Sequence, residues 1–263
     1  MDLPRLTPSS VTDLDCPKRF HTLRVLHQWP PRPHTTVNIG TEFGIALHAV
    51  LRHVFDPRHA PLPKLDHLDA WTRSAFFARN YPDTELREKE IARCIEVART
   101  YALNDDDAPF TIDVERQGEF PIAVNGTPLF LLSAKLDRVL VRPNEKVLTI
   151  RDYKTSRRYR NLEEAFFMLW AAKLLYPNYK SFALELDWID EQGDVKREVI
   201  HGKDLRGMHK PLIEKAVRLF TLLAEGEHHA EPGEACFGCL LRKECQPQIE
   251  VPLDTEHDIF EED

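Results

Sequence analysis

Long hydrophobic runs are missing from this sequence of 263 residues, and its first residues lack the pattern expected of an export leader. No apolar stretch approaches the roughly 20 residues that a membrane-spanning helix needs. The first residues, Met1-Asp-Leu-Pro4, contain neither a basic region nor an apolar segment. We therefore expect a cytoplasmic protein without a membrane segment, whose thiols are kept reduced.

A surplus of positive charge is missing as well. The 35 Lys and Arg are outnumbered by 43 Asp and Glu, which gives a formal net charge of −8. This sign is unfavourable for a protein that coats nucleic acid, because the phosphate backbone attracts cations. Part of the negative charge comes from the acidic end, residues 254–263, so a local basic groove remains compatible with the composition.

Internal repeats and low-complexity tracts are also absent, and the chain shows a clear change of pattern instead. Apolar periodicity and proline-rich links predict helices at 8–26, 40–55 and 84–103, with weaker helical sequence after the link 57–63. Further along, the pattern predicts strands 111–124, 129–141 and 146–153, helix 162–176, strands 180–189 and 195–201, and helix 204–224. This order predicts an α+β fold around a mixed sheet.

Two of the predicted strands carry aspartates at equal distances from the turn 142–145. In a tight antiparallel hairpin, Asp137 and Asp152 would lie opposite each other, about 5 Å apart at Cβ. Like charges at that distance destabilise a sheet unless a cation lies between them. Asp152 and Lys154 are two residues apart and point to one face of their strand. Two carboxylates and an ammonium at one place are the groups that metal-assisted phosphodiester cleavage needs, so the first hypothesis is a nuclease.

An Asp-x-Lys triplet taken alone is more often a surface ion pair of small energetic value. Asp137 in the opposing register makes this pair less ordinary. The same register places Lys135 opposite Lys154, where it is either a second phosphate-neutralising group or a solvated lysine. We favour the solvated lysine.

A histidine in the predicted helix 40–55 is the next candidate. His48 lies on the flank of the apolar stripe, one turn after Gly44, which leaves room for another group to approach. A lone helical histidine is usually a surface or core residue. Beside two aspartates that await a cation, its imidazole becomes a candidate metal ligand.

Cysteine is scarce, yet four of the five cysteines gather near the chain ends. Cys16 is followed much later by Cys236, Cys239 and Cys245 in a C-x2-C-x5-C pattern. Four thiolates can hold zinc or an iron–sulfur cluster, and disulfides are not expected in a reducing compartment. Structural zinc favours two C-x2-C knuckles, so the spacing favours iron–sulfur, and either group would join the two ends. Cys94 lies on the apolar stripe of its helix and is expected in the core.

In this order and spacing, the pieces resemble the PD-(D/E)XK nuclease superfamily. They are similar in particular to RecB-like nucleases with a four-cysteine iron–sulfur cluster, among them the AddB nuclease domain and the CRISPR-associated exonucleases. The resemblance covers nearly the whole chain. It rests on Leu6-Thr-Pro-Ser-Ser-Val with Cys16-Pro-Lys-Arg-Phe, Gly44-Ile-Ala-Leu-His48, Ala134-Lys-Leu-Asp137-Arg, Asp152-Tyr-Lys154-Thr-Ser and the cysteine triplet.

The resemblance implies a restriction-endonuclease-like αβββαβ core with a site for Mg²⁺ or Mn²⁺. The implied metal ligands are His48, Asp137, Asp152 and the carbonyl of Tyr153. Lys154 is implied as the catalytic lysine. The family also has a glutamate on its first core strand, which is either Glu115 or Glu119 here, with Glu115 favoured as a catalytic residue.

The resemblance also implies a [4Fe–4S] cluster. Its implied ligands are Cys16, Cys236, Cys239 and Cys245. We expect one nuclease domain at 1–248, with a helical insertion at about 57–104 and an acidic tail at 249–263. The cluster region would combine residues 1–30 with residues 230–248.

The sequence departs from the family pattern at two places. The family has Gln-x-x-x-Tyr on the helix after the lysine, and the aligned residues here are Phe166 and Trp170. Ala134 replaces the glycine of the family's Gly-x-x-Asp. The first departure puts a substrate-orienting contact in doubt.

The expected activity is a metal-dependent deoxyribonuclease, an exonuclease on single-stranded DNA or DNA ends in repair, recombination or CRISPR or phage DNA processing. Residues Arg157, Arg158, Tyr159 and Arg160 are expected to contact the DNA backbone, and the alternative is a solvated loop. No G-x-x-x-x-G-K-[ST] loop is present, so a helicase partner would be another chain. The competing hypothesis is a non-catalytic nucleic-acid-binding or assembly subunit that keeps the fold and the cluster.

Overall fold

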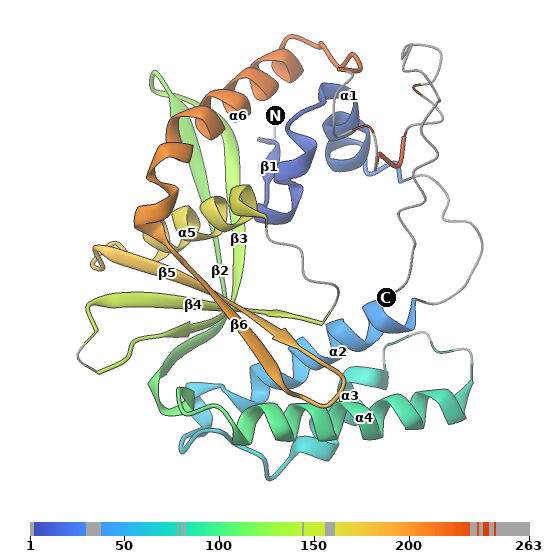
Figure 1. Ribbon diagram of the computed structural model, residues 1–263. Helices are drawn as coiled ribbons and strands as arrows, with labels where there is room; N and C mark the ends of the chain where they lie inside the picture. The colour runs from blue at the N-terminus through green and yellow to red at the C-terminus, as the bar shows by residue number, and fades with distance from the viewer. Residues whose placement is uncertain are drawn as a thin grey trace.

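A mixed six-stranded sheet forms the centre of the structure, with helices on both of its faces (Figure 1). The computed structural model describes residues 3–29, 38–77, 79, 81, 83–143, 145–155, 161–231, 236, 239–241 and 245. The strand order is β1-β3-β4-β5-β6, with β2 paired to the remaining edge of β3. β1 pairs with β3 and β4 with β5 in parallel, and the other neighbours are antiparallel. The expected α+β fold around a mixed sheet is confirmed.

The strands are β1 (Arg5–Leu6), β2 (Thr111–Val124), β3 (Thr127–Leu140), β4 (Val147–Lys154), β5 (Ser181–Ile189) and β6 (Val195–His201). The α-helices are α1 (Pro17–Phe20), α2 (Ile39–Val54), α3 (Leu68–Phe77), α4 (Thr84–Leu103), α5 (Leu162–Leu175) and α6 (His209–Ala224). Shorter 3₁₀ and π turns are η1 (Pro8–Asp13), η2 (His21–Val25), η3 (Pro57–His59), η4 (Ala108–Phe110) and η5 (Gly202–Met208).

Most of the predicted elements are confirmed within one or two residues, and two helices are not continuous. The segment predicted as one helix at 8–26 consists of η1, α1 and η2, because Cys16 is extended and Pro17 begins a new helix. The helix predicted to start at residue 204 begins with the 3₁₀ turn η5, and α6 follows. None of the helices in the described part of the chain is apolar and long enough to cross a membrane.

Short polar signals set the ends of several elements. Asn38, Asp83 and Asn161 each cap a helix, and their side-chain oxygens accept hydrogen bonds from backbone amides of the first turn. The tight β2–β3 turn is made by Asn125 and Gly126, with φ of 51° and 81°. Both residues have positive φ, which is the geometry of a two-residue type I′ hairpin loop.

The sheet separates two hydrophobic cores. One lies between the sheet and α5 and α6, and the other between the sheet and α2, α3 and α4 (Figure 1). In β4, Leu148 and Ile150 enter the first core, whereas Tyr153 enters the second. Asp152 therefore points to the α5 side of the sheet, in agreement with the alternation predicted from the sequence.

A network of charged side chains lies on the α4 side of the sheet. Arg138 and Arg151 are paired across β3 and β4, and both are 0% exposed. Asp105 bridges them, with Oδ2 2.5 Å from Nη1 of Arg138 and Oδ1 2.7 Å from Nη1 of Arg151. The further members are Arg142, Arg197, Asp107, Glu185 and Asp187. The four arginines and four carboxylates balance in charge, and Asp105 links β3 to β4 through Arg138 and Arg151.

Candidate metal centre

The two aspartates predicted to face each other lie where β3 and β4 separate. The last paired residues are Arg138 and Arg151, so the next residues in the same register are Asp137 and Asp152. The backbone amide of Tyr153 donates a hydrogen bond to Oδ2 of Asp137 over 3.1 Å. The Asp137 side chain thus occupies the place where the next rung of the strand pairing would be.

Lys154 lies on the same face of β4 as Asp152, as predicted. Its Nζ is 2.8 Å from Oδ2 of Asp152 and 3.5 Å from Oε1 of Glu164 at the start of α5. Burial lowers the pKa of Lys154, but the charges of Asp152 and Glu164 outweigh it and the net pKa is raised. The lysine is therefore held as an ammonium beside the buried carboxylate.

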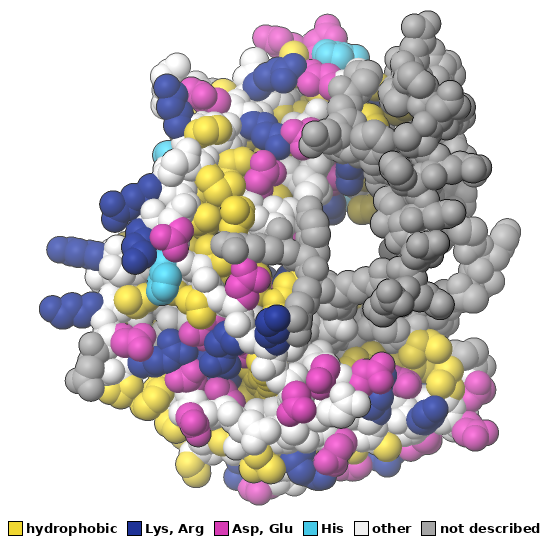
Figure 2. All heavy atoms as spheres, in the orientation of Figure 1, with side chains coloured by type: hydrophobic (Ala, Val, Ile, Leu, Met, Phe, Trp, Pro, Cys, Tyr) yellow, Lys and Arg dark blue, Asp and Glu magenta, His cyan; other side chains and the backbone are white. Residues whose placement is uncertain are grey.

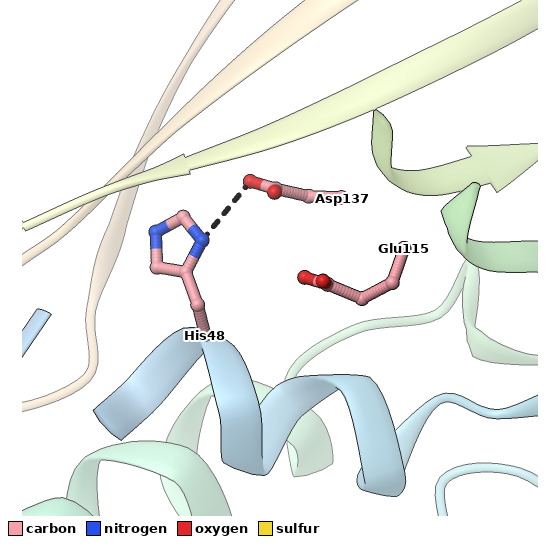
Figure 3. Close-up of side chains that lie close together, drawn as sticks. All are labelled: His48, Glu115 and Asp137. Carbon is pink, nitrogen blue, oxygen red and sulfur yellow. Dashed lines mark ion pairs between the residues drawn. The ribbon is translucent and has the colours of Figure 1, made fainter. Parts of the chain in front are cut away.

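His48 and Glu115 complete a three-residue cluster with Asp137 (Figure 3). One ligand atom from each of the three lies within 4.8 Å of the others. His48 Nδ1 is 3.2 Å from Oδ2 of Asp137. Glu115 has a φ of 53°, a left-handed conformation that is uncommon outside glycine and turns its carboxylate toward the histidine. Among the described residues, this is the group whose donor atoms converge as metal ligands do.

The carboxylates and the imidazole at this place shift the pKa values of one another. Burial and the charge of Asp137 raise the pKa of Asp152 to about 7, although Lys154 and His48 act in the opposite direction. Burial lowers the pKa of His48, but the hydrogen bond and charge of Asp137 outweigh it and the net pKa is raised. Burial raises the pKa of Asp137, but its contacts with His48 and Tyr153 outweigh this effect and the net pKa is lowered.

Carboxylates that share a buried site in this way favour a cation between them. Hard carboxylate oxygens with one imidazole are a donor set suited to Mg²⁺ or Mn²⁺. Glu115 forms an ion pair with Lys135, whose ammonium supplies a positive charge at the edge of the cluster. Lys135 was expected to be a solvated lysine, and its side chain is indeed 50% exposed, but it has a partner.

The approach of α2 to β4 depends on Gly44. A Cβ placed on Gly44 would lie 2.6 Å from Oγ1 of Thr155, the residue after Lys154. The space predicted next to Gly44, one turn before His48, is therefore occupied by Thr155, which directly follows β4. This close contact sets the distance between the histidine-bearing helix and the Asp152–Lys154 strand.

Gly44→Ala is expected to lower any metal-dependent activity by about 10²-fold, since a shift of about 1 Å at a reacting centre has effects of that size. The double variant Gly44→Ala/Thr155→Ala removes the clashing oxygen and should recover most of the loss. Metal-dependent turnover of the two variants and of Thr155→Ala alone is the measurement. Equal activity of Gly44→Ala and the wild type would show that the contact does not set the site geometry.

A cavity of about 660 Å³ opens beside Asp152, between η1, the β2–β3 hairpin and α5. From α5 it is lined by Glu164 and Met168, which are one helical turn apart. Phe166 and Trp170, aligned above with the family's Gln and Tyr, instead line a different cavity. Glu164 and Met168 precede Phe166 and Trp170 by two positions, and a shift of two along a helix turns a side chain to nearly the opposite face. The contact of Glu164 with Lys154 was not predicted from the sequence.

The remaining predicted site residues are placed as follows. Glu119 lines the cavity and pairs with Arg5 at 3.3 Å, outside the three-residue cluster. The ring of Tyr153 is buried among aromatic residues on the other face of the sheet, so only its backbone faces the aspartates. Residues 157–160, expected to contact DNA, lie outside the described residues.

Cys16 and the C-terminal cysteines lie in one region of the fold. The amide of Lys18 donates to the carbonyl of His229, and Cys245 packs with Leu23 in a small core. Burial raises the pKa of the Cys239 thiol, with contributions from the neighbouring thiols of Cys16 and Cys245. The four thiols are free, and they do not converge as closely as ligands of one ion.

Cys94 is fully buried in the α2–α4 core, as predicted. Burial raises the pKa of its thiol to about 12, so this cysteine is an inert core residue. It shares no contact region with the other four cysteines.

Residues 5–246 match the sequence model of the PD-(D/E)XK nuclease superfamily. The chain belongs to this superfamily. No curated protein matches the sequence. Thirteen chains of solved structures match, and one is the crystal structure of SSO0001. It has 12% sequence identity and a TM-score of 0.40, over 95% of this chain and 89% of that chain.

Membership in the superfamily implies a nuclease that uses divalent metal ions on a nucleic-acid substrate. The restriction-endonuclease-like core expected from the sequence agrees with the mixed sheet and its flanking helices. His48, Glu115 and Asp137 supply the candidate metal site that such an activity needs.

Proposed function

We propose that this chain is a Mg²⁺- or Mn²⁺-dependent deoxyribonuclease, an exonuclease that acts on single-stranded DNA or DNA ends. The observation that carries the proposal is the convergence of His48, Glu115 and Asp137 beside the buried Asp152–Lys154 pair. The cavity at Asp152 would give a DNA strand access to the metal centre.

His48, Glu115, Asp137 and Asp152 would hold the metal, with the carbonyl of Tyr153 as a further ligand. A bound divalent ion would supply a water of lowered pKa and neutralise the phosphate. Lys154, held as an ammonium by Asp152 and Glu164, would donate from Nζ to that water or to a phosphate oxygen. Glu164 would orient this ammonium.

The test is incubation of fluorescent single-stranded and double-stranded DNA with the full chain and Mn²⁺, in parallel with chelator. We expect cleavage that chelator abolishes and that Asp152→Ala lacks, with products that shorten from an end. Absence of cleavage, or equal cleavage by the wild type and Asp152→Ala, would contradict the proposal and favour a non-catalytic nucleic-acid-binding subunit.

We further propose that Cys16, Cys236, Cys239 and Cys245 hold a [4Fe–4S] cluster that joins the chain ends. The support is the cysteine spacing, the nearness of the Cys16 and Cys245 thiols to that of Cys239, and the amide of Leu241, which donates to the sulfur of Cys239. Thiolates around a cluster are separated by its inorganic core, so they need not converge as ligands of a single ion do.

Anaerobic purification followed by absorption spectroscopy and iron analysis tests the cluster. We expect a brown protein that loses its iron in Cys239→Ser and keeps it in the control Cys94→Ser. A colourless protein with stoichiometric zinc would refute the iron–sulfur assignment.

A further inference from the structure

The second cavity, away from the metal centre, combines aromatic walls with an unbalanced positive rim. It has a volume of about 1170 Å³ and lies between α5, the start of β5 and η5. Phe166, Trp170 and Phe182 contribute aromatic walls. Trp170 and Phe182 are only partly buried, so their rings remain accessible from the cavity.

The rim carries four exposed cations, Lys173, Lys180, Lys203 and Arg206. His201 and His209 stand beside them, and no Asp or Glu is among the described residues that line the cavity. Within the described part of the chain, none of the four cations has an ion-pair partner. Figure 2 shows Lys and Arg side chains projecting along the left edge of the molecule, beside the α5–β5 connection.

This concentration of positive charge is unusual in a chain with a net charge of −8. Elsewhere the arginines are largely paired, as in the buried network around Asp105. Four cations that lack an ion-pair partner among the described residues repel one another around this cavity, and an anionic occupant would relieve that repulsion. The aromatic walls indicate that this occupant has flat apolar parts as well as negative charge.

The size of the cavity favours a polymer segment over a small anion. Sites for small molecules are typically about 300–1,000 Å³, and this cavity exceeds that range while staying open to solvent. A basic groove with aromatic side chains is the arrangement that binds single-stranded nucleic acid, with bases stacked on the rings and phosphates on the cations.

We propose that this cavity is a second binding site for single-stranded DNA, which holds part of the strand away from the metal centre. This proposal rests on the proposed nuclease function. Val147 at the start of β4 lines the cavity, and Asp152 lies five residues further along the strand. At about 3.3 Å per residue the two sites are about 16 Å apart along β4.

Helix α5 lies between the two sites and serves both. Glu164 and Met168 face the cavity at Asp152, whereas Phe166 and Trp170 face the second cavity. A strand that occupies both sites therefore passes around α5, and only a strand long enough to reach both gains from the second site. Short substrates would use the metal centre alone.

The experiment compares binding of single strands of about 30 and about 6 nucleotides, sizes that bracket a typical single-strand site. The variant is Lys203→Glu/Arg206→Glu, and the matched control is Lys89→Glu/Lys196→Glu, at exposed lysines away from the cavity. Binding is measured by fluorescence anisotropy in chelator, so that cleavage plays no part. We expect the cavity variant to bind the long strand about tenfold more weakly, with a reduced salt dependence, and the control to be unchanged.

Cleavage of the short strand should be the same in the cavity variant and the wild type. This outcome separates the two proposals, because failure of the nuclease function would abolish cleavage in both proteins while leaving the binding difference. Trp170→Phe should also lose the larger part of the quenching of intrinsic fluorescence by the long strand.

Equal affinity of the cavity variant and the control for the long strand would overturn the proposal. An acidic protein segment is the competing occupant, and a labelled peptide with the sequence of residues 254–263 probes it. Binding of this peptide that is lost in the cavity variant, with DNA affinity unchanged, would assign the cavity to an acidic protein segment instead.

Discussion

Replacing Asp152 by asparagine is expected to abolish divalent-metal binding at the centre and to reduce DNA cleavage by about 10³-fold or more. The substitution keeps the shape of the side chain and removes its negative charge, which burial and the charge of Asp137 disfavour. Binding of Mn²⁺ by calorimetry and cleavage of single-stranded DNA are the two measurements.

The companion variant Lys154→Met separates metal binding from the chemical step. It should lose cleavage by about 10²-fold or more, because the ammonium beside Asp152 is removed. It should bind Mn²⁺ at least as tightly as the wild type, since a competing cation has left the carboxylate. Loss of metal binding in Lys154→Met would contradict this division of roles.

Two glutamates provide a test of the metal ligands and its matched control. Glu115→Gln should weaken Mn²⁺ binding, because this carboxylate belongs to the cluster with His48 and Asp137. Glu119→Gln should behave as the wild type, because its carboxylate pairs with the exposed Arg5. The opposite result would move the family glutamate to Glu119.

The second large effect concerns stability. Asp105→Ala is expected to lower the free energy of unfolding by about 3–5 kcal/mol, because it leaves two buried arginines without their shared partner. Both Arg138 and Arg151 are 0% exposed and bond to opposite oxygens of Asp105. Asp66→Ala, which breaks an exposed pair with Lys64, should change stability by no more than about 0.5 kcal/mol. Urea unfolding followed by circular dichroism measures both.

The acid stability of the chain depends on the same carboxylate. Burial raises the pKa of Asp105, but Arg138 and Arg151 outweigh it and the net pKa is lowered. Its stabilising contribution is therefore complete above the ordinary aspartate value of about 4 and is lost as the pH falls further, through the folded pKa. The stability difference between the wild type and Asp105→Ala should be constant between pH 7 and about 5 and should shrink below about 4.

Local patterns were sufficient to predict the helix at 84–103, the strand succession and the Asn125-Gly126 turn. Amphipathic periodicity, helix caps and turn residues act over a few positions, so they can be read without a structure. The same holds for the Asp137–Asp152 pairing, because a tight hairpin places residues opposite each other by simple counting.

The charged network was missed because its parts are far apart in the sequence. Asp105 belongs to a run of three aspartates that resembles a solvated loop, and the arginines alternate with the predicted metal ligands on β3 and β4. Only the packing of the segment after α4 against the sheet shows that these charges are buried and paired. The contact of Glu164 with Lys154 was missed for a similar reason, since the direction of a helical side chain depends on where the helix packs.

The sequence by itself determined the fold class, the nuclease resemblance and the two aspartates with their lysine, because register and strand alternation are local properties. Tertiary structure alone decided that Glu115 joins His48 and Asp137, and that Glu164 meets Lys154. It also decided that Phe166 and Trp170 line a separate basic cavity. These contacts join α2, β2, β3, β4 and α5, and their distances depend on how the elements pack on the sheet, which no local pattern specifies.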